Sequence, residues 1–211
     1  MYSNLSKKLI LTAALVCLSA LLWAQAVRKD ALQLYREKQY DTAIQVCEQE
    51  IRAKPDNMDA YSVLIWCFLR QKRYLQAEEK ALQARKHNTS DIRVTEALAE
   101  AQYYLGKNDA ALENFQKYVS VARESESDYG WCYFYMGEIY IKKSKYQHAD
   151  ISFTMATRSK PERSDFWTRL GYAREMCKDY TSAIQAYDKA LQLNADYYDA
   201  KRGKERCQSR L

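Results

Sequence analysis

The chain has few of the residues that interrupt regular structure. Its 211 residues include five glycines and two prolines, and no stretch is of low complexity. Because glycine and proline mark turns, loops and flexible linkers, their scarcity excludes a loop-rich fold and long linkers between domains. The sequence therefore favours a compact array of helices.

Residues that carry catalysis or bind metals are also scarce. The two histidines, His87 and His148, lie far apart, and His148 is expected on the solvent side of its helix. The six cysteines show neither a C-x-x-C motif nor the spacing of a zinc site. Nucleophile motifs and phosphate-binding loops are missing as well. We therefore expect a protein that is not an enzyme and that needs no cofactor or metal.

The charge balance is mild. The net charge of +6 falls to +4 if the first 26 residues are removed, because they contain two lysines and no arginine or acidic residue. Acidic and basic residues are interspersed along the chain, as on solvated helix faces, and there is no basic block. A nucleic-acid partner is therefore not expected.

The first 26 residues have the pattern of a secretory signal peptide. Lys7 and Lys8 precede the apolar run Leu9–Trp23, which is too short for a comfortable membrane span, and Ala24–Ala26 is a small-x-small cleavage site. We expect cleavage after Ala26 and export to the periplasm or cell envelope. An uncleaved signal anchor is the alternative, and only this form would associate with a membrane.

Five cysteines would remain after cleavage. They are scattered, at Cys47, Cys67, Cys132, Cys177 and Cys207. Export permits disulfides, but the odd number leaves at least one thiol unpaired. The sequence favours small, buried, reduced cysteines and leaves the disulfide state open.

The stretch Gly130–Arg163 shows the unit that organises the chain. Apolar and small residues fall on one face of each of two predicted helices, and the polar turn Lys142–Lys145 separates these helices. The first helix carries Tyr133, Met136, Gly137 and Tyr140, and the second carries Ala149, Phe153 and Ala156 before Pro161. Because Gly137, Ala149 and Ala156 have almost no side chain, the two helices can approach to about 8–10 Å.

The same pattern recurs at intervals of 34 residues. The next copy downstream has Trp167, Leu170, Gly171, Ala183, Tyr187 and Ala190 at the equivalent positions. Three copies lie upstream: the nearest has Leu98, Ala99, Ala111 and Phe115, the second has Tyr61, Leu64, Ala77 and Ala81, and the first of the chain has Ala31, Leu34, Ala43 and Cys47. Both prolines, Pro55 and Pro161, occupy the same position of the repeat. The one break is an insertion at Glu126–Tyr129, expected to be a solvent-exposed loop.

This 34-residue pattern resembles the tetratricopeptide (TPR) repeat family. The resemblance implies an all-α fold, a right-handed α-α superhelix of five helix pairs. The expected organisation is a signal peptide (1–26), five repeats (27–57, 58–91, 92–125, 130–163 and 164–197) and a capping helix, Tyr198–Leu211. The capping helix is polar and charged, as the exposed end of a repeat array requires.

In the TPR family the first helix of each pair lines an inner groove where partners bind. The inner positions here carry aromatic residues with basic residues at the edges, which is typical of a binding surface. The predicted partner-binding residues are Trp66, Arg70, Arg93, Tyr103, Tyr104, Phe134, Tyr135, Lys142, Arg169 and Tyr172. The alternative is that some of these aromatic residues pack between repeats.

The sequence is compatible with two functions. The first is an exported scaffold or adaptor that binds a protein or peptide in its groove. The second is a carrier or uptake-system subunit that binds a small apolar ligand there. A receptor for chaperone tails is not favoured, because Leu32 and Val63 stand where that class of TPR protein has asparagines. The sequence does not specify the oligomeric state.

Overall fold

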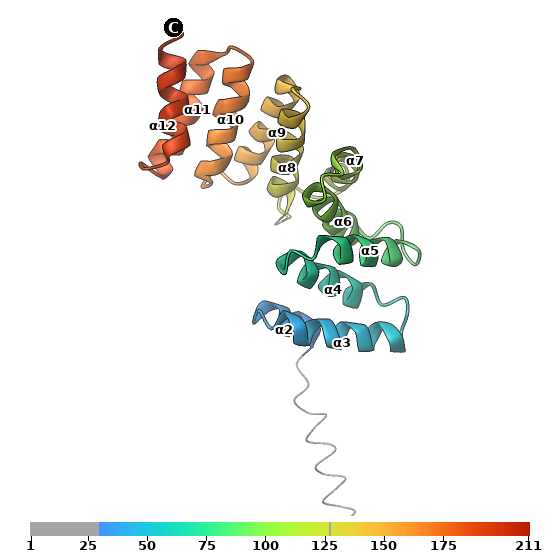
Figure 1. The fold of residues 1–211 in the computed structure, drawn as a ribbon. Helices are drawn as coiled ribbons and strands as arrows, with labels where there is room; N and C mark the ends of the chain where they lie inside the picture. Colours follow the sequence, from blue (N-terminus) through green and yellow to red (C-terminus); the bar gives the residue numbers. More distant parts are fainter. Residues whose placement is uncertain (1–29, 127) are drawn as a thin grey trace, which may run out of the picture.

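The structure, a computed structural model, describes residues 30–126 and 128–211. The expected signal peptide lies outside the described residues. Eleven helices and no strand are found in the described ranges, and they form a chain of stacked helix pairs (Figure 1). The helices are α2 (Ala31–Arg36), α3 (Tyr40–Ala53), α4 (Met58–Arg70), α5 (Tyr74–Arg85), α6 (Ile92–Tyr104), α7 (Asn108–Val119), α8 (Tyr129–Lys142), α9 (Tyr146–Ser159), α10 (Ser164–Met176), α11 (Tyr180–Leu193) and α12 (Tyr198–Gln208). The predicted all-α solenoid is confirmed.

Each helix pair turns through one residue in the left-handed backbone region. These residues are Lys38, Lys72, Gly106, Ser144 and Lys178, with φ between 57° and 75°. The amide after each of them donates to a carbonyl of the first helix, for example Arg73 N to Phe68 O at 2.8 Å, which closes that helix. Successive left-handed turn residues are 34 positions apart, except that Gly106 and Ser144 are 38 positions apart. The four additional residues correspond to the insertion that the sequence predicts between the third and fourth repeats.

Small residues allow the two helices of a pair to touch. The alanines at the first crossing position of the five second helices, Ala43, Ala77, Ala111, Ala149 and Ala183, are all fully buried. Gly137 lies against the Phe153 ring and Gly171 against the Tyr187 ring, where an added Cβ would meet ring carbons at 2.6 Å and 2.7 Å. The expectation that both glycines lie at helix crossings is therefore confirmed.

Polar side chains cap the amino-terminal ends of several helices. Asp30, Asn57, Asp91 and Asp179 accept hydrogen bonds from backbone amides in the first turn of α2, α4, α6 and α11. Asp91 follows the Asn88–Ser90 loop, so this polar segment leads directly into a helix cap.

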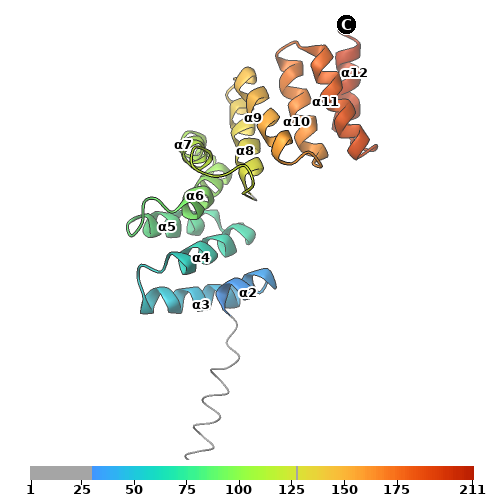
Figure 2. The same cartoon turned by 180° about the vertical axis from the view of Figure 1, so that it is seen from behind.

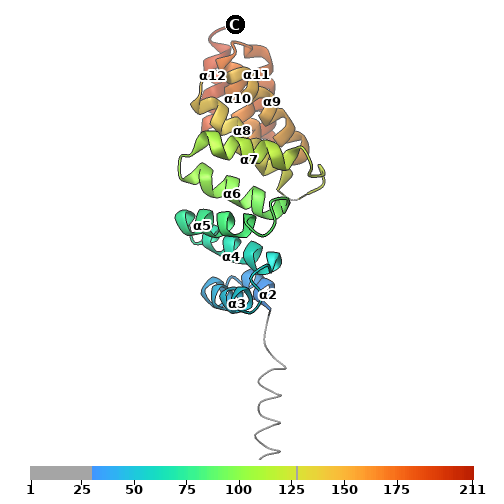
Figure 3. The same cartoon turned by 90° about the vertical axis from the view of Figure 1, so that its right-hand side faces the viewer.

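The first helices of consecutive pairs lie on the inner side of the array. α2 packs on α4, α4 on α6, and α6 on α8, whereas consecutive second helices do not pack on one another in the described part of the chain. A stack of pairs that touches more closely on one side curves toward that side. The even-numbered helices therefore form the concave face, as the TPR resemblance implies; Figures 2 and 3 show the array from behind and from the side.

The array changes direction between α7 and α8. In Figure 1 the pairs α2–α5 run across the view, and α8–α12 stand upright above them. The connection that holds the insertion joins these two parts. Tyr129 does not belong to an exposed loop, as the insertion was expected to be. It begins α8 and is buried, and its ring packs against Tyr133 one helical turn later, with the two centroids 5.1 Å apart.

Candidate partner-binding site

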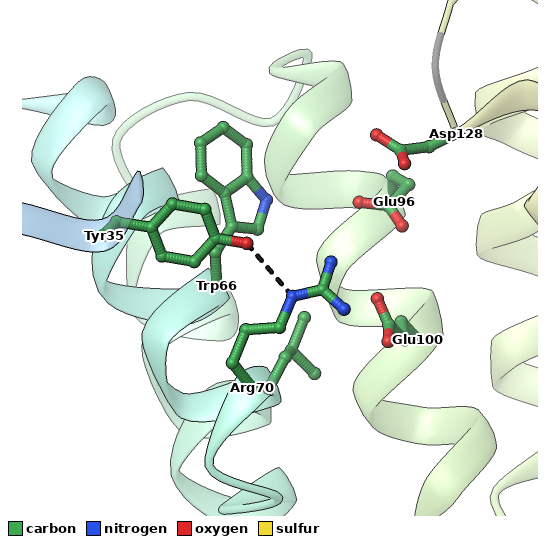
Figure 4. Close-up of a pocket in the computed structure, with 7 residues that line it drawn as sticks. Tyr35, Trp66, Arg70, Glu96, Glu100 and Asp128 are labelled. Carbon is green, nitrogen blue, oxygen red and sulfur yellow. Dashed lines mark hydrogen bonds between the residues drawn. The ribbon is translucent and has the colours of Figure 1, made fainter. Parts of the chain in front are cut away.

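A cleft of about 240 Å³ opens on the concave face where α2, α4 and α6 meet. Its walls combine aromatic, basic and acidic residues, and Figure 4 shows them around a common space. The lining residues are Tyr35, Trp66, Leu69, Arg70, Glu96, Glu100 and Asp128. The cleft therefore draws on three consecutive inner helices and on the residue before α8.

One wall of the cleft is aromatic. The ring centroids of Tyr35 and Trp66 are 5.9 Å apart, and Tyr35 also contacts Tyr40, with centroids 5.7 Å apart. Arg70 Nε donates a hydrogen bond to the Tyr35 hydroxyl at 3.1 Å, and this bond raises the pKa of the guanidinium. Arg70 is thus held by the aromatic wall, with its guanidinium between that wall and the glutamates (Figure 4).

The opposite wall is acidic. Glu96 and Glu100 stand one turn apart on α6, so both carboxyl groups point to the same side of the helix. Glu96 is 8% exposed, and neither carboxyl group makes a hydrogen bond or an ion pair with another described residue. Burial, then the neighbouring Glu100, raises the pKa of Glu96 well above its usual range. Burial is also the main cause of the raised pKa of Glu100.

A second group of aromatic residues follows along the concave face. Tyr103 and Tyr135 have ring centroids 4.7 Å apart, and the hydroxyl groups of Tyr104 and Tyr135 are hydrogen-bonded at 3.1 Å. Tyr104 stacks on Tyr74 with centroids 4.5 Å apart, and Lys142 Nζ lies 4.3 Å from the centroid of Tyr103. Burial raises the pKa of Tyr103 to about 12. Tyr104 remains 45% exposed, so it offers the most accessible ring of this group.

Phe134 packs between two repeats. It is one of the predicted partner-binding residues, and its ring stacks on Phe166 with centroids 4.5 Å apart and lies 5.7 Å from the ring centroid of Phe153. Both partners are fully buried. Phe134 therefore fits the alternative given for these aromatic residues: it is partly buried and fills the space between two repeats, among α8, α9 and α10.

Two predicted basic residues are held by acidic neighbours. Arg93 pairs with Asp59 at 2.6 Å and with the helix-capping Asp91 at 2.7 Å, outside the cleft. Arg169 makes a two-point ion pair with Glu138, with the Nη2–Oε2 distance at 2.9 Å, and its guanidinium lies 5.1 Å from the Tyr172 ring centroid. Of the predicted residues, the structure brings Trp66 and Arg70 together in the cleft and Tyr103, Tyr104, Tyr135 and Lys142 together beside it.

The carboxyl groups of the cleft were absent from the predicted site. The repeat phase places Glu96 and Glu100 at inner positions, so the sequence does predict that their side chains point toward the concave face. Their burial without a partner depends on how closely α4 packs on α6, which the phase alone does not give. Among the described residues, no three His, Cys, Asp or Glu side chains converge to hold a metal ion. None of the helices in the described ranges is long and apolar enough to cross a membrane.

Comparison with known proteins identifies the family. A family model described as Tetratricopeptide repeat matches residues 31–137, and a second model with the same description matches residues 136–198. The chain belongs to the tetratricopeptide repeat family. The two matches together span ten of the described helices, which agrees with the helix pairs seen in the structure.

Several known proteins resemble this TPR chain. Subunit 3 of the anaphase-promoting complex from Schizosaccharomyces pombe (strain 972) is 29% identical over 138 residues, which cover 64% of the chain and 20% of that subunit. The chain thus spans about a fifth of the length of this curated relative. The crystal structure of YrrB, titled a TPR protein with an unusual peptide-binding site, has a TM-score of 0.69 at 16% identity, over 83% of this chain and 88% of that one. The crystal structure of MamA protein has a TM-score of 0.66 at 18% identity, over 80% and 91%. These structural likenesses show the fold.

Proposed function

We propose that the chain is an exported, non-catalytic scaffold that binds a protein or peptide partner on the concave face of its repeats. The observation that carries this proposal is the cleft between α2, α4 and α6, where an aromatic wall faces the carboxyl groups of Glu96 and Glu100, which make no hydrogen bond or ion pair with another described residue. Buried polar groups are normally hydrogen-bonded, so such a site is suited to receive groups from another molecule.

The similar proteins support protein binding in general terms. YrrB is titled as having a peptide-binding site, and the curated relative is a subunit of a multiprotein complex. The whole activity of that larger subunit does not follow for this shorter chain, so the partner is proposed from the site itself. Both comparisons favour an interaction module over an enzyme.

A small apolar ligand is less suited to this cleft. Three of its lining residues are acidic and one is an arginine. Covering carboxyl groups with an apolar molecule would remove water from them without replacing its hydrogen bonds, which is costly. A carrier of apolar molecules would therefore need a different surface.

Partner capture tests the binding surface. The wild-type chain and a Trp66→Ala variant should be used to capture proteins from the envelope fraction, and affinities should be measured for the protein recovered. We expect Trp66→Ala to weaken binding about thirtyfold, because a central buried aromatic residue typically contributes about 2 kcal/mol or more.

The matched control is Leu75→Ala, which truncates a side chain 68% exposed on a second helix. Circular dichroism should show that both variants keep their helix content. Equal partner affinity of wild type, Trp66→Ala and Leu75→Ala would contradict the proposal.

Export is tested at the amino terminus. We expect protein recovered from cells to begin at Val27 and to fractionate with the periplasm or envelope, because the preceding segment has the pattern of a cleaved signal. Sequencing of the amino terminus after fractionation gives the answer. Soluble cytoplasmic protein that retains Met1 would contradict export while leaving the binding surface untouched.

A further inference from the structure

The starting observation is the burial of Glu96. This side chain is 8% exposed, makes no hydrogen bond or ion pair with another described residue, and points into the cleft (Figure 4). A carboxylate removed from water without a partner is strongly unfavourable. Replacement of this carboxylate by an amide would be the simplest way to relieve the cost, yet the chain carries the acid. The position is therefore suited to a positively charged partner group.

The charges around Glu96 leave room for one more cation. Glu100 lies one helical turn away, so the two glutamates of α6 share this space with the guanidinium of Arg70. Arg70 turns toward both glutamates without closing an ion pair with either, and its Nε is bound to Tyr35. The other titratable groups that interact with Glu96 from neighbouring elements are Tyr118, Cys132 and Tyr135. None of these is cationic.

The shape of the site selects the kind of cation. The carboxyl groups within the described ranges do not converge closely enough to coordinate a metal ion. The aromatic wall of Tyr35 and Trp66 instead offers ring faces opposite the acids, and such faces attract ammonium and guanidinium groups. A side chain with an apolar stem and a charged end matches this combination.

Resting on the proposed function, we propose that the cleft captures a lysine or arginine side chain of the protein partner. Its stem lies along Trp66, and its charged end reaches Glu96 and Glu100. The bond from Arg70 Nε to the Tyr35 hydroxyl holds the guanidinium on the aromatic side of this space, short of an ion pair with either glutamate. The segment that binds this concave face is therefore basic.

A peptide selection tests both levels of this proposal. The full mature chain is used to select binders from a random peptide display library. Each basic residue of the best binder is then replaced by a neutral analogue of similar length, norleucine for lysine or citrulline for arginine. We expect one such replacement to weaken binding roughly tenfold or more, as loss of a hydrogen bond between charged groups does.

The matched variants locate the effect. In Glu96→Gln/Glu100→Gln the basic and neutral peptides should bind with nearly equal affinity, whereas in Glu113→Gln, an exposed carboxylate on α7, the tenfold difference should persist. Circular dichroism checks that all variants are folded. A separate titration with spermidine tests whether a free amine is the ligand.

The outcomes separate the two proposals. Binders that Trp66→Ala weakens, but that lack a sensitive basic residue or ignore the glutamate changes, would overturn the basic side chain alone. Binding of spermidine that depends on the glutamates, with no peptide showing that dependence, would overturn a protein source of the cation. Failure to select any peptide that Trp66→Ala weakens would overturn peptide binding on the concave face, and the basic side chain with it.

Discussion

The two parts of the array use the same inner positions in opposite ways. In α2–α6 the concave residues Tyr35, Trp66, Glu96 and Glu100 surround an open cleft, and the two glutamates make no hydrogen bond or ion pair with another residue that the structure describes. In α8–α12 the side chains at the corresponding positions already contact other residues of the chain. Phe134 stacks on Phe166, Arg163 covers the Trp131 ring at 4.7 Å from its centroid, and Arg169 pairs with Glu138.

This difference shows that composition at inner positions does not by itself make a binding surface. Both parts carry aromatic and charged residues at the phase that points inward. In the first part, Glu96 is a largely buried carboxyl group that makes no hydrogen bond or ion pair with another described residue, and this is a property that an external partner can relieve. We therefore propose that recognition takes place at α2–α6 and that α8–α12 have a mainly structural role.

The largest expected effect is on the stability of the second part. Phe134→Ala should lower the free energy of unfolding by about 3 kcal/mol, because the ring fills the space between α8, α9 and α10. Urea denaturation measures the change. Tyr104→Ala, which removes a ring that is 45% exposed, is the control and should cost far less. If the two variants lose the same free energy of unfolding, the inner residues of the two parts do not differ in how much they contribute to packing.

A smaller effect is expected at a helix crossing. Gly171→Leu should cost about 1–3 kcal/mol, because even a Cβ there would meet the Tyr187 ring at 2.7 Å. Thermal and urea unfolding give the cost.

Two control variants show whether the loss of stability in Gly171→Leu comes from packing. Gly106→Ala changes a turn with no heavy atom within 4 Å of the new Cβ, so its cost, about 1 kcal/mol, reflects only the positive φ of 75°. Lys145→Ala, in an exposed turn, should cost little. A Gly171→Leu variant as stable as the wild type would contradict the packing seen between α10 and α11.

The smallest effect is a change in pH dependence. The pKa of Glu96 is raised above 4.5 in the folded chain, so the native state holds a proton that the unfolded state releases. This contribution to stability is present below the unfolded pKa and is lost as pH rises through the folded pKa. Glu96→Gln should therefore flatten the fall in stability with rising pH and should stabilise the chain at neutral pH.

A matched glutamate from the second part sharpens this test. Glu138→Gln should destabilise the chain at neutral pH by about 1.5 kcal/mol, because it weakens the ion pair with Arg169. Melting temperatures across the pH range measure both variants, with Glu113→Gln as an exposed control. If Glu96→Gln and Glu138→Gln shift the melting temperature in the same direction, the comparison between the two parts fails.

Several features were determined by the sequence alone. The 34-residue phase of small and aromatic residues predicts the helix pairs, because a close crossing of two helices requires a residue such as Gly137 or Ala149 at a fixed place. It also predicts which helices face inward, and the direction of Trp66, Arg70 and Glu96 follows from that phase. The insertion is visible in the sequence as a break in the repeat.

Only the tertiary structure decided which inward residues remain available. Phe134 and Trp66 occupy inward positions of the same repeat pattern, but one is covered by Phe166 from the next repeat and the other borders an open cleft. The burial of Glu96 without a partner likewise depends on the packing of α4 against α6. Sequence periodicity fixes the direction of a side chain within its own helix. The distance and side chains of the neighbouring repeat, which come from the packing of the whole array, determine whether that side chain is covered, paired or open.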